Sequence, residues 1–188
     1  MGESLRVGEA ELLVRASAGD RAAFDELVRH RFGEIYRLLH RLVGNHEDAE
    51  DLAQDCFVKA YRSLRFYRGE GTFAAWLARI AVHLARDHHR HRGRQLRTIA
   101  LELAEVEPAA RPTEELTQRE LVGLVGDAVE DLPSNLRAAL VLRVLEGRDY
   151  EDVARATGMK RGTVRTQVMK ARKRLMASLR PWLGGEAR

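Results

Sequence analysis

Apolar residues recur every third or fourth position through the first half of the chain, which is the spacing of one helix face. The first such stripe comprises Phe24, Val28, Phe32, Ile35, Leu39 and Leu42. After Gly44-Asn45 a second follows, made of Ala49, Leu52, Ala53, Cys56, Phe57, Ala60 and Leu64. A third comprises Phe73, Trp76, Leu77, Ile80 and Leu84, with Thr72 as the expected N-cap. Together with a short helix near residues 9–18, these stripes predict an all-α first domain over residues 1–95.

The periodicity weakens over residues 96–112, where Pro108 and Pro112 and the scarcity of large apolar residues predict a flexible linker. Thr113, followed by two glutamates, predicts the start of the next helix. A second helical domain is expected over residues 113–188. Its expected core residues are Leu116, Val122, Val125, Val129, Leu132, Leu136, Leu140, Val144, Leu145, Val153, Val164, Val168, Ala171, Leu175 and Leu179. The predicted fold class is therefore all-α, with two small helical domains joined by a flexible linker.

Charge is distributed unevenly, although the net charge is only +4. Five acids and no Lys or Arg lie between Asn45 and Cys56, whereas residues 83–98 hold five arginines. The segment from Gly158 to Arg180 holds eight basic residues and no acid. Two basic segments separated by an acidic stretch predict two contacts with a polyanion such as nucleic acid. The alternative is that each run is simply a solvated helix face.

A helix-turn-helix is predicted between Asp149 and Arg165. Asp149 can cap a short helix, Gly158 can adopt the left-handed conformation that a tight turn needs, and Thr163 is expected to begin the second helix. This motif places the start of its second helix in the DNA major groove. The side chains expected to face DNA are Lys160, Arg161, Thr163, Arg165, Thr166 and Lys170. A plain helical hairpin with a basic surface is the alternative.

An acidic stripe is predicted in the first domain. Asp48, Asp51 and Asp55 are spaced three and four apart, which stacks them on one helix face. Paired carboxylates can bind a metal or act in acid–base catalysis, but no histidine has a matching position on this helix. A basic protein partner or simple solvation remain as the two main interpretations.

Aromatic residues stand beside arginines between Phe66 and Arg86, an arrangement suited to unstacked single-stranded bases. Tyr67, on a glycine-rich loop, is the expected base contact, whereas Phe73 and Trp76 are expected in the core. Four histidines at positions 83, 88, 89 and 91 could suggest a metal, but arginines interleave with them. We therefore expect a basic nucleic-acid face, with no metal and no cofactor.

Three features of the sequence indicate the cellular compartment of the protein. The chain has no apolar run of membrane-spanning length, no basic-then-apolar leader and a single cysteine, Cys56. A cytoplasmic protein without direct membrane insertion is expected.

Three segments, in order, resemble the extracytoplasmic-function (ECF) sigma factors of the RNA polymerase sigma factor family. They are Asp48–Asp55 (DAEDLAQD), Tyr67–Glu70 with Phe73–Ala81, and Tyr150–Ala154 with Gly162–Arg165. The resemblance runs from about Glu9 to Leu183. It implies a transcription initiation factor rather than an enzyme, which binds core RNA polymerase and promoter DNA and is often held inactive by an anti-sigma factor.

The resemblance also implies roles for individual residues. Asp48, Asp51, Gln54 and Asp55 would dock on the polymerase clamp, and the second domain would contact the polymerase flap. Phe66, Tyr67, Arg68, Glu70, Thr72, Arg79, His83, Arg86 and Asp87 would capture and read the downstream promoter element. Lys160, Arg161, Thr163, Arg165, Thr166 and Lys170 would read the upstream element. Two rival interpretations remain open at this point: a stand-alone helix-turn-helix regulator, and a metal-dependent nuclease or hydrolase.

Overall fold

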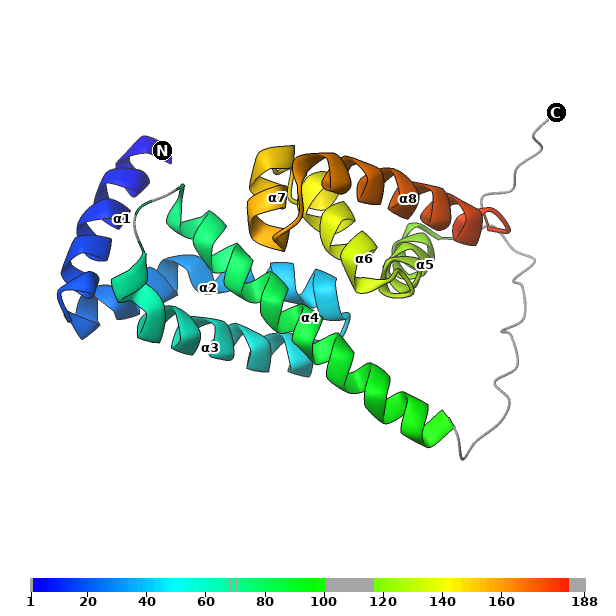
Figure 1. Ribbon diagram of the computed structural model, residues 1–188, viewed down its shortest axis with the longest axis horizontal. Coiled ribbons are helices and arrows are strands. Elements are labelled where there is room, and N and C mark those ends of the chain that lie inside the picture. The colour runs from blue at the N-terminus through cyan, green and yellow to red at the C-terminus, as the bar shows by residue number, and fades with distance from the viewer. Residues whose placement is uncertain (1, 68, 70, 101–116, 183–188) are drawn as a thin grey trace.

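The computed structural model describes residues 2–67, 69, 71–100 and 117–182, without the side chains of residues 2–7, 93–100 and 118–119. Within those ranges the ordered elements are helices, and no strand is present. They form two bundles that lie side by side, which we call the N-terminal and the C-terminal module (Figure 1). The predicted all-α class is confirmed. None of the helices in these ranges is long and apolar enough to cross a membrane.

The N-terminal module contains the three predicted amphipathic helices and a leading helix. Its elements are α1 (Gly2–Ser17), α2 (Arg21–Val43), α3 (His46–Ser63), the single 3-10 turn η1 (Leu64–Phe66) and α4 (Phe73–Ala100). The stripe residues Ile35, Leu39, Cys56 and Leu77 are fully buried where α2, α3 and α4 meet. The hydrophobic periodicity therefore identified the correct core face of each helix. Residues 96–100 continue α4 beyond the predicted domain boundary.

The turn between α2 and α3 is fixed by two adjacent residues. Gly44 has φ 76° at the end of α2, and its N–H donates to the carbonyl of His40. Asn45 is the N-cap of α3, because its side chain accepts a hydrogen bond from the N–H of Asp48 at 3.0 Å. The positive φ favours glycine, and the side-chain acceptor satisfies a donor that the helix leaves free.

Replacing Asn45 by alanine should lower the free energy of unfolding by about 1 kcal/mol, because the cap acceptor is lost. Asn45→Asp, which keeps an oxygen at the same place, should retain the wild-type stability. Urea denaturation followed by circular dichroism measures both. Equal stabilities of the alanine and aspartate variants would contradict the assigned cap.

The C-terminal module contains α5 (Gln118–Glu130), α6 (Ser134–Leu140), a turn of π-helix η2 (Val141–Leu145), α7 (Tyr150–Thr157) and α8 (Arg161–Leu179). Thr117 caps α5 in a reciprocal arrangement with Glu120. The helix start predicted at Thr113, the core position Leu116 and the linker from residue 101 onward lie outside the described residues. Most other predicted core positions are confirmed, including Val129, Val153 and Val164.

Three predicted core positions are wrong. Val122, Val144 and Leu145 are 68%, 42% and 50% exposed. Val144 and Leu145 lie in the π-helical turn η2, where the wider turn breaks the spacing of an α-helix face. Val122 lies on the solvent-exposed side of α5. An apolar residue at helical spacing is buried only where a neighbouring element covers it.

Candidate nucleic-acid interface

The helix-turn-helix is formed by α7 and α8. The side chain of Asp149 accepts from the N–H of Asp152 at 2.7 Å, and Gly158 ends α7 with φ 71°. Val153 and Val164 are fully buried, which fixes how the two helices pack. Helix α8 begins at Arg161, with Lys160 as the N-cap residue, so the predicted start at Thr163 is two positions late. The helix start was predicted two residues too late because the N-cap residue Lys160 makes no side-chain hydrogen bond to the helix, so no capping pattern in the sequence marks this position.

All of the side chains predicted to meet the upstream element are exposed along the first half of α8. They are Lys160, Arg161, Thr163, Arg165, Thr166 and Lys170. The opposite side of the helix is buried through Val164, Val168 and Ala171. The arrangement presents one basic, solvent-facing surface at the start of a helix, which is the geometry that enters a major groove.

The guanidinium of Arg165 lies near an aromatic ring. Its guanidinium carbon lies 5.8 Å from the ring centroid of Tyr150, and that of Arg143 lies 4.9 Å from the same ring. Such cation–π contacts restrict a side chain that would otherwise sample many rotamers. By contrast, the hydroxyl of Thr166 donates to the carbonyl of Gly162 at 3.1 Å, within its own helix. Arg165 is therefore the better candidate for contact with a base edge, because its guanidinium is not bonded within its own helix as the Thr166 hydroxyl is.

The loop before α4 presents one aromatic ring and packs another. Phe66 is 67% exposed, with the guanidinium of Arg65 4.7 Å from its ring centroid. Tyr67, the predicted base contact, packs 5.3 Å from the ring of Trp76 and donates its hydroxyl to the carbonyl of Gly71 at 3.0 Å. Burial raises the pKa of Tyr67, so the phenol stays a donor. Tyr67 thus braces this loop, and Phe66 presents the exposed aromatic ring.

The sequence also made predictions for four other residues in this loop and at the start of α4, namely Thr72, Phe73, Arg68 and Glu70. The side chain of Thr72 accepts from the N–H of Ala75 at 3.2 Å, which confirms the predicted N-cap of α4. Phe73 is buried, as predicted. Arg68 and Glu70 lie outside the described residues.

Helix α4 carries the remaining residues predicted for the downstream element. Arg79 and His83 both reach the surface. Partial desolvation of the His83 ring by its neighbours, with Arg86 and Arg79 nearby, lowers the pKa of His83, so its imidazole is neutral at neutral pH. Arg86 is half-buried and donates to the carbonyl of Thr157 at 3.2 Å, whereas Asp87 pairs with Arg90 one turn later.

A cleft of about 410 Å³ lies between the start of α4 and the helix-turn-helix. It is lined by Gly71, Ala75, Trp76, Arg79, Ala154, Arg155 and Gly158. Trp76 was predicted to be core, but it is only half-buried and lines this cleft. Trp76 has the same helical spacing as the buried residues of α4, so sequence periodicity alone could not distinguish a position that lines the cleft from a position in the core.

The acidic face of α3 is formed by three exposed side chains, Asp51, Gln54 and Asp55. Asp48 shares this face in sequence spacing but is held by α4, with an oxygen 3.3 Å from His88 Nε2 and 3.1 Å from Arg92 Nη1. The free part of the face is therefore shorter than the sequence predicted. The partner helix lies about forty residues further along the chain, beyond the reach of a local pattern.

Two of the histidines toward the end of α4 contact other helices of the N-terminal module. His88 faces Asp48, and His89 Nε2 lies 2.8 Å from the carbonyl oxygen of Leu42. In the described ranges, no three His, Cys, Asp or Glu side chains are grouped so that they could hold a metal ion.

Comparisons with known proteins identify both modules. The family profile for Sigma-70 region 2 matches residues 27–95, and that for Sigma-70, region 4 matches residues 123–175. The chain is 35% identical to the RNA polymerase sigma-H factor of Pseudomonas aeruginosa, over 93% of this chain and 95% of the relative. It is 36% identical to the ECF RNA polymerase sigma-E factor of Haemophilus influenzae, over 90% and 94%.

A solved structure supports the same assignment. The chain superimposes on the sigma factor RpoE of Bartonella quintana, solved in complex with the anti-sigma factor NepR, with a TM-score of 0.65 and 25% identity. The match covers 84% of this chain and 96% of that one. A stand-alone regulator with an unrelated sensing domain would not match both sigma regions in order. The chain belongs to the extracytoplasmic-function sigma factors of RNA polymerase.

Proposed function

We propose that this sigma factor divides promoter recognition between its two modules. The start of α8 reads the upstream element, η1 and α4 capture and read the downstream element, and the acidic face of α3 docks on core polymerase. The proposal is carried chiefly by α8, where every predicted DNA-facing side chain is exposed and the surrounding segment contains no acid. Phosphate contacts by its lysines and arginines would supply affinity, and contacts with base edges would supply specificity.

The division of the chain follows from the same proposal. Residues 1–95 form the part that docks on polymerase and reads the downstream element, residues 96–112 connect the modules, and residues 113–188 read the upstream element. The two matched family profiles, at 27–95 and 123–175, support this order. The second module would also lean on the polymerase flap. The chain acts by binding, with no catalytic step, and works in the cytoplasm where promoter DNA is transcribed.

An anti-sigma factor is the proposed regulatory partner. RpoE of Bartonella quintana was solved with such a factor, and the likeness to it extends over most of both chains. A partner of this class would compete with polymerase or with DNA for the surfaces described above. Co-purification from the native cell with and without core polymerase would test this proposal.

The assignment of the downstream loop is tested by duplex opening. Phe66→Ala should raise the free energy of the open complex by about 1 kcal/mol, the low end of what one stacked base contributes, because an exposed ring is lost. Phe66→Trp should retain opening. Permanganate reactivity of unpaired thymines, measured on holoenzyme bound to a cognate promoter, reports opening. Wild-type permanganate reactivity in Phe66→Ala would show that Phe66 does not hold an unpaired base. It would leave the role proposed for α8 at the upstream element unaffected.

A further inference from the structure

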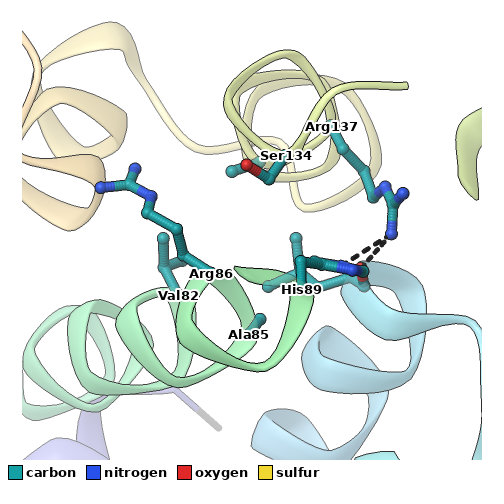
Figure 2. A pocket seen from close by; sticks show the side chains of 8 residues that line it. Val82, Ala85, Arg86, His89, Ser134 and Arg137 are labelled. Carbon is teal, nitrogen blue, oxygen red and sulfur yellow. Dashed lines mark hydrogen bonds between the residues drawn. The ribbon is translucent and has the colours of Figure 1, made fainter. Parts of the chain in front are cut away.

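His89 of α4 lies where the C-terminal module meets the end of α2. Its Nε2 is 2.8 Å from the carbonyl oxygen of Leu42 and 2.8 Å from Nη1 of Arg137, which belongs to α6 (Figure 2). The same Nη1 donates to the Leu42 carbonyl at 2.7 Å. One imidazole nitrogen, one guanidinium nitrogen and one carbonyl oxygen are therefore in mutual contact, and we call this three-way contact the junction.

Arg137 is fixed in the junction by the ends of two helices. Helix ends leave carbonyl oxygens without intrahelical partners, and the negative end of the helix dipole favours a cation there. Nη1 reaches the last turn of α2, and Nη2 donates to the carbonyls of Glu130 and Leu132 at the end of α5. Only 7% of the surface of Arg137 is exposed. The guanidinium therefore cannot turn away from His89 without breaking several hydrogen bonds.

The protonation state of His89 decides whether the junction is satisfied. A guanidinium can only donate, so we assign the neutral ring with its proton on Nδ1, where Nε2 accepts from Nη1 of Arg137. A protonated ring carries a hydrogen on both nitrogens. Two N–H groups and two positive charges would then face each other in the junction. The contact as it stands therefore requires a neutral His89.

The charged groups that surround His89 oppose a positive charge on its ring. Arg137 faces the ring from α6, His88 and Arg92 lie on the same helix, and α2 contributes the carbonyl of Leu42. Burial, together with these three basic side chains, lowers the pKa of His89, while the carbonyl acts in the opposite direction. The ring is therefore neutral at neutral pH.

The acids around the junction are engaged by other cations. Asp48 of α3 lies against His88, with an oxygen 3.3 Å from its Nε2. Glu130 and Asp131, at the end of α5, act on the charge of Arg137. In the described part of the chain, no carboxylate pairs with the ring of the junction histidine itself. A proton gained there would thus have no counter-charge.

The space beside the ring is also too small to solvate a new charge. Val82, Arg86 and Ser134 line a cavity of about 10 Å³ next to His89 and Arg137, which is room for about one water molecule (Figure 2). A buried charge without a partner or solvent is costly. Separation of the two modules at the junction would admit water to both cations and remove this cost.

We propose that the contact between the two modules is sensitive to pH: it forms while His89 is neutral and loosens when His89 is protonated. Because the pKa of His89 is lowered in the docked arrangement, a proton binds more tightly when the modules are apart. The stabilisation is complete above the ordinary pKa of histidine, about 6.5, and is lost as the pH falls through the lower pKa of the docked ring. The proposal concerns the free chain and does not depend on the proposed function.

Single-molecule energy transfer in the full-length protein measures the docked fraction directly. Dyes whose emission does not change with pH are attached to Glu50→Cys in the N-terminal module and Asp127→Cys in the C-terminal module, both exposed positions. Burial raises the pKa of the Cys56 thiol to about 12, so Cys56 stays unlabelled. Measurements between about pH 7.5 and about pH 5.5 cover the range in which histidine is the side chain that ordinarily titrates. Circular dichroism at both ends of the range checks that the helices remain folded.

Two glutamine variants separate His89 from its neighbour. His89→Gln keeps an oxygen that can accept from Arg137 but does not titrate in this range. His88→Gln removes the adjacent histidine, which faces Asp48 within the N-terminal module. Each variant is compared with the wild-type chain that carries the same two dyes.

We expect the ratio of docked to separated wild-type molecules to fall with pH, by at most about tenfold per pH unit, the limit for one proton. His89→Gln should stay docked over the whole range, and His88→Gln should retain the wild-type pH dependence. A constant docked fraction in the wild type would overturn the proposal. So would a wild-type pH dependence in His89→Gln, because the titrating group would then lie elsewhere, and so would its loss in His88→Gln.

Discussion

Reversing the charge of both Asp51 and Asp55 to lysine should lower the affinity for core RNA polymerase at least about tenfold. Both carboxylates are exposed on α3, so their replacement leaves the buried side of the helix unchanged. Charges placed against a complementary partner accelerate association and fix the orientation, and like charges there cost several kcal/mol. Fluorescence titration of labelled sigma factor with core enzyme measures the change.

A matched control reverses two exposed acids elsewhere, Glu11→Lys and Asp127→Lys, which changes the net charge equally. The control should bind core polymerase nearly as well as wild type. If both double variants weaken binding to the same extent, the effect is one of net charge and the acidic face of α3 is not the docking surface.

Removing Arg165 should cost about 1–3 kcal/mol on the preferred upstream element and should reduce discrimination against altered bases at one position. The physical reason is the position of Arg165 in the exposed first half of α8, with its guanidinium carbon 5.8 Å from the ring centroid of Tyr150 in α7. Lys170, further along the same exposed surface, is expected to meet phosphate. Lys170→Ala should weaken binding to all sequences alike and reduce the salt dependence by about one unit.

Both variants are compared as holoenzyme on one promoter and on a set of single-base changes in its upstream element. Discrimination lost in Arg165→Ala but kept in Lys170→Ala is the expected pattern. Equal loss of affinity on every sequence in both variants would mean that Arg165 and Lys170 both contact the DNA backbone and that Arg165 reads no base.

The elements with a long and regular apolar stripe could be predicted from the sequence. Helices α2, α3 and α4 follow from it, as do the caps at Thr72 and Asp149, because these depend on residues within one or two turns. The same logic failed for Val144 and Leu145, since a single π-helical turn shifts which side of the helix faces the core. Local spacing cannot foresee this change.

The candidate site likewise has features that could be predicted from the sequence and features that could not. The exposed surface of α8 follows from the alternation of Val164 and Val168 with basic residues, and the structure agrees. The engagement of Asp48 by His88 and Arg92, and of Arg86 by Thr157, depends on contacts between residues far apart in the chain. These contacts arise only when separate helices pack, so residue types alone did not reveal which predicted residues were already occupied.

As a sigma factor, this chain enables core RNA polymerase to start at specific promoters. Run-off transcription with purified core polymerase, on DNA that carries a cognate promoter, tests it most directly. We expect a transcript of defined length with the full-length protein and none with core polymerase alone, together with a strong reduction for Asp51→Lys/Asp55→Lys. A wild-type protein that binds the promoter by itself but yields no specific transcript with core polymerase would contradict this role.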